Sequence, residues 1–138
     1  MFKVPTPAQI HSHMSHLQLA ANDMSYANLL TKAATETDPI ERLKKIAIFG
    51  IAAHTLNPSI VQMKVPLNPI LGETLQRELE TGERFYAEQI SHHPPITAYS
   101  CYGPNGEFEY HGHHQLKAWL NGTSSLGGAK EGNCILKF

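Results

Sequence analysis

The spacing of the apolar residues changes near residue 70, and this change limits the chain to a small set of folds. Before it, apolar side chains such as Leu17 and Met24 recur at helical intervals. After it, the period becomes two and short turn sequences separate the runs. The pattern predicts a helical region over residues 10–55, a loop over 56–69 and an antiparallel β-meander over 70–138. The predicted fold class is therefore α+β, mainly β, with the helices packed against the sheet.

The sequence Thr-Asp-Pro-Ile-Glu indicates the start of a helix. Asp38 can cap the helix N-terminus, Pro39 suits the first helical position, and Glu41 can reach back to form a capping box. The apolar stripe that follows consists of Ile40, Leu43, Ile46, Ala47, Phe49 and Ala53. We therefore predict a helix from Pro39 to about His54, preceded by one or two helices between residues 13 and 35.

Four longer runs and two weaker ones predict the strands of the meander. They cover residues 71–79, 85–90, 96–102, 108–120, 123–129 and 134–138. Turn sequences separate them, and Asn121 followed by Gly122 is typical of a two-residue hairpin turn. The chain stops at Phe138 inside the last run, where a strand edge would be left unpaired. We interpret this ending as truncation of a longer domain at its C-terminal side.

Composition and charge exclude several classes of protein. The 138 residues are 41% hydrophobic and 17% charged with a net charge of −1, which is typical of a globular chain without a basic field for nucleic acid. The two cysteines, Cys101 and Cys134, have neither a zinc-binding spacing nor the number that a disulfide framework needs. No run approaches the roughly 20 apolar residues of a membrane span. We therefore expect a cytoplasmic protein.

The sequence His-His-Pro-Pro at residues 92–95 interrupts the predicted sheet. Neighbouring side chains of a regular strand point to opposite faces, so His92 and His93 would ordinarily diverge. Pro94 removes an amide donor and restricts His93 to an extended conformation, which breaks the ladder and can let both rings converge. Two protonated imidazoles offer N–H donors to a phosphate group. The alternative is a strand entry with two half-exposed histidines, and the residues alone leave both interpretations open.

Two ordered segments resemble the oxysterol-binding-protein-related family. Residues 88–95, Glu-Gln-Ile-Ser-His-His-Pro-Pro, are similar to the family signature, with Ile90 where valine is commoner. Upstream, residues 66–74, Pro-Leu-Asn-Pro-Ile-Leu-Gly-Glu-Thr, resemble the second diagnostic segment. Further likenesses lie at residues 26–42 and 113–118. The resemblance therefore covers nearly the whole chain.

The resemblance implies a lipid-binding and lipid-transfer domain and not an enzyme. Domains of this family are incomplete β-barrels around an apolar lipid tunnel, with helices at one end. They carry one sterol or phospholipid at a time, and many exchange it for phosphatidylinositol 4-phosphate. The implied protein has no cofactor besides the bound lipid and no metal, and it contacts membranes transiently from the cytoplasm. Residues 1–138 would form the N-terminal part of such a domain.

The resemblance also implies which residues hold the phosphate. His92 and His93 would bind the 4-phosphate at the tunnel mouth, and Asn68 would contribute from the neighbouring loop through charge-assisted hydrogen bonds. The family usually carries a lysine immediately before the proline of the upstream segment. Here Val65 stands at that position, and Lys64 lies one residue earlier, where it either reaches the phosphate or is solvated.

Three other interpretations follow from the residues. Alternation on the longest predicted strand places His111 and His113 on one face, at a spacing able to chelate a divalent metal. We favour a solvated strand face instead, with His114 pointing inward to a hydrogen bond. Glu73 and Glu88 have no accompanying nucleophile or base, so catalysis is not expected. A truncated fragment that binds or scaffolds without transferring lipid is the remaining alternative.

Overall fold

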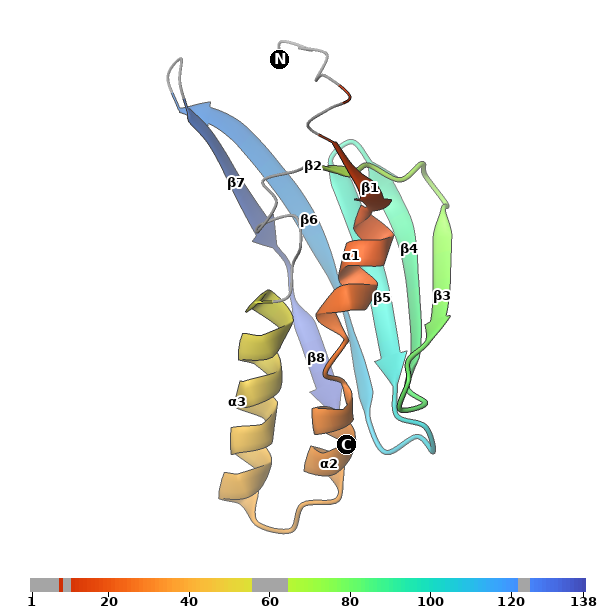
Figure 1. Ribbon diagram of the computed structural model, residues 1–138, viewed down its shortest axis with the longest axis vertical. Helices are drawn as coiled ribbons and strands as arrows, with labels where there is room; N and C mark the ends of the chain where they lie inside the picture. The colour runs from red at the N-terminus through yellow and green to blue at the C-terminus, as the bar shows by residue number, and fades with distance from the viewer. Residues whose placement is uncertain (1–7, 9–10, 56–64, 122–124) are drawn as a thin grey trace.

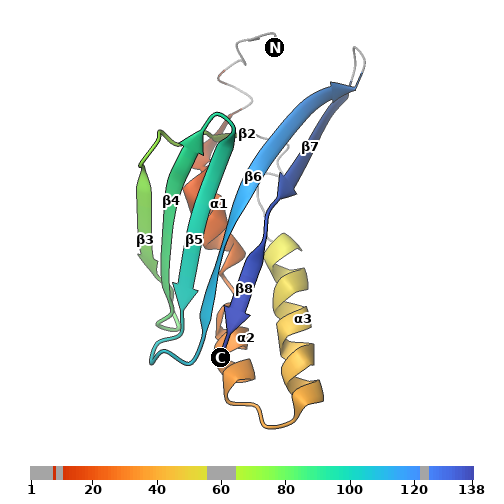
Figure 2. The same ribbon diagram turned by 180° about the vertical axis from the view of Figure 1, so that it is seen from behind.

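Three helices and a curved antiparallel sheet make up most of the part of the chain that the structure describes. The computed structural model describes residues 8, 11–55, 65–121 and 125–138. Figures 1 and 2 show the helices gathered on one face of the sheet. They are α1 (His16–Asp23), α2 (Asn28–Ala34) and α3 (Pro39–Thr55). The predicted fold class, in which helices pack on an antiparallel sheet that does not close, is confirmed.

The main sheet has the strand order β3-β4-β5-β6-β7, with β8 also paired to β6. Its strands are β3 (Thr74–Glu78), β4 (Arg84–His92), β5 (Pro95–Tyr102), β6 (Glu109–Asn121), β7 (Ser125–Glu131) and β8 (Cys134–Lys137). This is the predicted meander, although Gly122 of the expected hairpin turn lies outside the described residues. β7 and β8 follow β6 in one continuous register, since Gln115 lies opposite Glu131 and Gly112 opposite Cys134. They form a single hairpin arm with a break between them.

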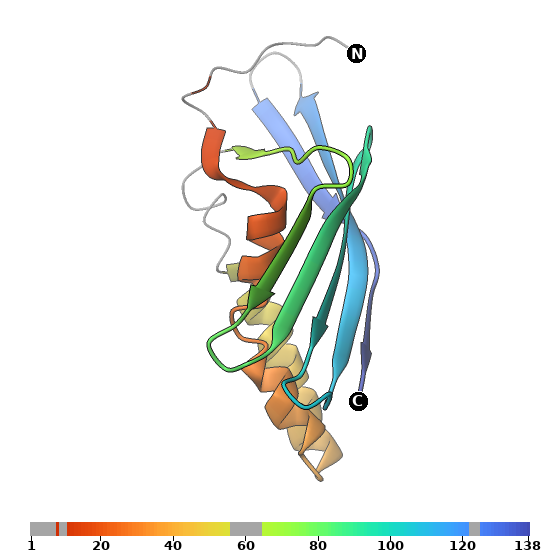
Figure 3. The same cartoon turned by 90° about the vertical axis from the view of Figure 1, so that its right-hand side faces the viewer.

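The core lies between the helices and the inner face of the sheet (Figure 3). Burial alternates along β4, where Phe85 is 0% exposed and its neighbour Tyr86 is 38% exposed. Leu17 of α1 joins this core from the helical side. α3 contributes Phe49, whose ring packs edge-on against Tyr110 of β6 with 5.6 Å between centroids. Among the described residues, no helix covers the opposite face of the sheet, and that face is in contact with water.

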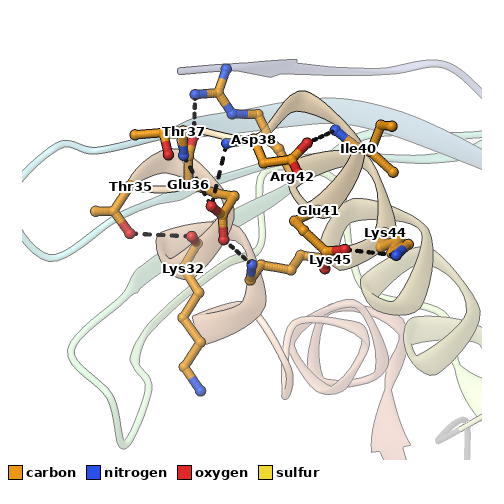
Figure 4. A network of polar contacts seen from close by, with 10 residues as sticks. All are labelled: Lys32, Thr35, Glu36, Thr37, Asp38, Ile40, Glu41, Arg42, Lys44 and Lys45. Atoms are coloured by element: carbon orange, nitrogen blue, oxygen red, sulfur yellow. Dashed lines mark hydrogen bonds and ion pairs between the residues drawn. The ribbon is translucent and has the colours of Figure 1, made fainter.

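The predicted start of α3 is correct in its cap but wrong in its capping box. Asp38 Oδ1 accepts the backbone amide of Ile40 at 2.8 Å, as Figure 4 shows. The amide of Asp38 donates to Glu36 Oε1 at 3.4 Å, whereas Glu41 pairs with Lys44 at 2.6 Å. The turn between α2 and α3 brings Glu36 next to the cap, and Glu36 therefore takes the amide that the sequence assigned to Glu41.

Two short strands form where the sequence predicts other structure. β1 (His11–Ser15) and β2 (Val65–Leu67) make a parallel pair apart from the main sheet. The sequence predicts a helix start in place of β1 and a loop over 56–69, and the structure corrects both. Ser15 Oγ accepts the amide of Gln18 while the Gln18 side chain accepts the amide of Ser15, which fixes the beginning of α1 after β1.

Candidate functional site

His92 and His93 lie at the turn between β4 and β5. Because His92 pairs with Pro95, His93 and Pro94 are the two loop residues of this hairpin. A register shift just after Gln89 changes the alternation of the strand before it reaches the histidines. The two imidazole centroids lie 4.6 Å apart with their planes at 65°. The structure therefore brings the two rings together at one end of the sheet.

Asn68 approaches His92 from the loop that follows β2. Its Nδ2 lies 3.4 Å from Nδ1 of His92, and the carbonyl oxygen of Pro69 lies 2.9 Å from the same nitrogen. Nδ1 cannot accept from the amide and donate to the carbonyl at once, and the shorter contact favours an Nδ1–H that donates to Pro69. The second ring nitrogen, Nε2, is then an acceptor in the neutral ring and a donor only in the protonated ring.

A buried glutamine holds Asn68 in this position. Gln89 is 1% exposed, and its Nε2 donates to Asn68 Oδ1 at 3.3 Å and to the carbonyl of Ser91 at 2.9 Å. Its Oε1 accepts the hydroxyl of Thr97 at 2.7 Å. Gln89 is not among the phosphate ligands predicted from the sequence. The signal was present, because alternation places this polar residue on the inward face of β4 together with Phe85, and inward polar groups need partners.

We expect Gln89→Met to destabilise the protein by about 1–3 kcal/mol, because the Thr97 hydroxyl and the Asn68 amide oxygen would lose these hydrogen bonds. Urea denaturation measures the change in the free energy of unfolding. Gln76→Met, at an exposed position of β3, is the matched control and should change it by less than about 0.5 kcal/mol. Equal effects of the two substitutions would show that the Gln89 network adds no stability.

The remaining predicted ligands are only partly placed. Lys64 lies outside the described residues, so the structure places three of the four predicted phosphate ligands. His111 Nδ1 lies 3.1 Å from Glu109 Oε1, and His113 is exposed.

Within the described parts of the chain, no group of three or more His, Cys, Asp or Glu side chains could hold a metal ion. The same parts contain no helix long and apolar enough to cross a membrane.

A cavity of about 290 Å³ lies between α1, α3 and the strands β6 to β8. His114 in its wall is 5% exposed, and its Nδ1 has no hydrogen-bond partner among the described residues, in contrast to the predicted bond. Burial, followed by the charge of Lys130, lowers the pKa of His114 to about 3 and the pKa of His16 to about 4. Both rings are therefore neutral at pH 7, beside the ion pair of Lys130 with Asp23.

Comparison with protein families identifies the chain. The family model described as Oxysterol-binding protein matches residues 1–138. The chain belongs to the oxysterol-binding protein family. Oxysterol-binding protein 9 of Dictyostelium discoideum is 37% identical over 118 residues, which are 85% of this chain and 27% of that protein. The predicted family resemblance is thus confirmed.

Crystal structures of this oxysterol-binding protein family share the fold. The Osh1 ORD domain in complex with ergosterol has a TM-score of 0.84 and 32% identity, with 97% of this chain and 31% of that chain covered. The Osh3 ORD in complex with PI(4)P from Saccharomyces cerevisiae has a TM-score of 0.83 and 28% identity, with 100% and 36% covered. The chain therefore spans only part of the length of its relatives.

Proposed function

We propose that this chain binds the phosphorylated headgroup of a phosphoinositide, as the headgroup-binding part of a lipid-transfer domain. The observation that carries the proposal is the convergence of His92, His93 and Asn68 at one end of the sheet. The Osh3 domain was crystallised with PI(4)P, and this supports phosphatidylinositol 4-phosphate as the ligand. The proposed role is binding and transport without catalysis or a cofactor, by a cytoplasmic protein that contacts membranes transiently.

The chemistry of the three side chains suits a phosphate monoester. His92 keeps one N–H on the carbonyl of Pro69, so its other nitrogen can donate to the phosphate when the ring is protonated. His93 adds a second, exposed imidazole, and Asn68 adds an uncharged amide donor. Charge-assisted bonds of this kind are about twice as strong as neutral ones. Lys64, two residues before Pro66, would bring a further positive charge from the same segment.

The apolar part of the lipid could enter only a small cavity in this chain. At about 290 Å³, the cavity beside α1 and α3 lies at the lower end of the sizes typical of small-molecule sites, about 300–1,000 Å³. Its neutral His114 ring is compatible with an uncharged occupant. We propose that the cavity shelters part of a sterol or of a phospholipid tail, and that exchange follows because two lipids exclude each other from one pocket.

Titration calorimetry with water-soluble, short-chain phosphatidylinositol 4-phosphate tests the headgroup site without requiring a complete lipid pocket. We expect the chain to bind this ligand and to discriminate against short-chain phosphatidylinositol, which lacks the phosphate. The double substitution His92→Ala with His93→Ala should weaken binding by about 10–100-fold, because two charge-assisted hydrogen bonds are lost.

The matched control is His111→Ala with Lys137→Ala, which removes two basic side chains that pair with Glu109 on β6. This variant should keep the affinity of the parent chain. The proposal is wrong if the two double variants bind the phosphorylated ligand equally well, or if the parent chain does not prefer the phosphorylated ligand.

A further inference from the structure

Large apolar side chains project from the end of the sheet that carries the headgroup site. Ile70 and Leu71 are 70% and 65% exposed, and Leu67 and Ile90 are 47% and 49% exposed. These four residues are referred to here as the apolar tip. Ile70 and Leu71 belong to the loop between β2 and β3, the loop that also carries Asn68, and Leu67 is the last residue of β2. Figures 1 and 3 show this loop at the same end of the molecule as the turn between β4 and β5.

Hydrogen bonds hold the apolar tip outward. The amide of Ile70 donates to Glu73 Oε2 at 3.0 Å, and the amide of Glu73 donates to the carbonyl of Ile70 at 3.1 Å. The amide of Gly72 donates to the carbonyl of Gln89 at 2.9 Å, and the amide of Gln89 donates to the carbonyl of Glu73 at 2.9 Å. Pro69, between the exposed residues, is buried. The loop is therefore fastened to β4, and its apolar side chains cannot turn inward without breaking these bonds.

We propose that the apolar tip inserts into the surface of a lipid bilayer and thereby brings Asn68, His92 and His93 to the level of the phosphate groups. The inference rests on the proposed headgroup site, because a ligand of that site is a bilayer component. An exposed apolar surface next to a polar binding site is typical of a surface that binds a membrane or a protein partner. The apolar face of an interfacial helix enters the boundary between headgroups and acyl chains by about 5–10 Å, and a similar depth for the apolar tip would leave the adjoining polar groups among the lipid phosphates.

The charges near the apolar tip indicate which kind of bilayer it fits. Residues 65–76 and 88–97 contain Glu73 and Glu88 but no lysine or arginine. These segments therefore supply no permanent positive charge to attract anionic lipids. Lys64, which adjoins the first segment, is assigned to the headgroup site. The insertion itself is driven by apolar burial and suits a zwitterionic surface.

Co-flotation with phosphatidylcholine and phosphatidylethanolamine vesicles, free of phosphoinositide, measures this insertion directly. We expect the parent chain to bind these vesicles at both low and high salt. Ile70→Ser with Leu71→Ser should reduce the bound fraction about tenfold, because two large side chains no longer enter the apolar layer. Thermal unfolding of each variant verifies that these exposed substitutions leave the fold intact.

The matched control is Ile40→Ser with Leu43→Ser on α3, where the exposed fractions are 64% and 65%. This variant should bind vesicles like the parent chain. The inference is overturned if the α3 variant loses binding while the Ile70 and Leu71 variant keeps it, or if neither variant differs from the parent. It is also overturned if gel filtration shows a dimer that the Ile70 and Leu71 substitutions convert to a monomer, since a second copy would then cover the tip.

Soluble short-chain phosphatidylinositol 4-phosphate separates this inference from the proposed function. The Ile70 and Leu71 variant should bind the soluble ligand with the affinity of the parent chain, because the ligand needs no bilayer. The His92 and His93 variant should lose the soluble ligand and keep its binding to phosphoinositide-free vesicles. If the Ile70 and Leu71 variant also loses the soluble ligand, the apolar tip has no separate function in membrane insertion. If the His92 and His93 variant keeps the soluble ligand, the headgroup site is assigned wrongly.

Discussion

Replacing Phe85 by alanine should lower the free energy of unfolding by about 3–5 kcal/mol. The ring is fully buried on the inner face of β4, where it belongs to the same core cluster as Leu17, Leu30 and Phe108. Removing it takes away the transfer free energy of the ring and leaves a space that the surrounding elements can fill only in part. Since small domains unfold with a total of about 5–15 kcal/mol, this single change removes a large fraction of the stability. Urea denaturation gives the value.

The neighbouring substitution Tyr86→Ala provides the control for Phe85→Ala. Tyr86 points to the uncovered face of the same strand and is 38% exposed, with its ring 6.1 Å from that of Tyr102. We expect a loss of about 1 kcal/mol, the central value for single substitutions. A loss at Tyr86 as large as that at Phe85 would mean that the inner and outer faces of the sheet have been assigned wrongly.

Mild acid should destabilise the protein through His114, which is buried, and His16, which is partly buried. Burial lowers the pKa of His114 to about 3 and that of His16 to about 4, from an ordinary value of 6.5, and the charge of Lys130 adds to both shifts. The unfolded chain therefore binds protons that the folded chain does not. The contribution of these two neutral rings to stability is fully present above pH 6.5 and is lost as the pH falls toward 3–4. At about pH 5, each ring should lower the free energy of unfolding by about 2 kcal/mol relative to its value at neutral pH.

Urea denaturation at about pH 7.5 and about pH 5 measures this loss. Glu36 and Glu107 also have lowered pKa values, but these start from 4.5, so both carboxylates remain charged over this interval. His114→Gln should remove about half of the loss, whereas His13→Gln, at an exposed position of β1, should leave it unchanged. Equal pH dependence of the parent chain and the His114 variant would contradict the assignment to this ring.

Local patterns predicted the elements that depend on local interactions. The helix from Pro39 is found because Asp38 and Pro39 specify its first turn and the apolar residues recur within it. The faces of β6 are correct because alternation is a property of any strand, so His113 lies outside and His114 inside. The apolar stripe of α3 was too broad, because it combined the buried Phe49 with residues on the exposed side of the helix.

Local sequence patterns did not predict the contacts between distant segments. The parallel pair of β1 and β2 links residues more than fifty positions apart, and no local period reports such pairing. The convergence of His92 and His93 was predicted from the prolines, but Asn68 entered only through the family resemblance. The register shift after Gln89 depends on the partner strand, so the sequence carries no separate sign of it. Whether these groups bind phosphate stays a prediction.

The hairpin arm of β7 and β8 restricts how the length of this chain can vary. Its register along β6 is the same on both sides of the break, and Gly132 approaches so closely that a Cβ there would lie 1.9 Å from the carbonyl oxygen of His113. Inserting or deleting one residue at the break would move the following strand by one position. Leu136 would then leave the core and the exposed Ile135 would replace it. Within the arm, evolution can exchange side chains far more readily than it can add or remove a residue.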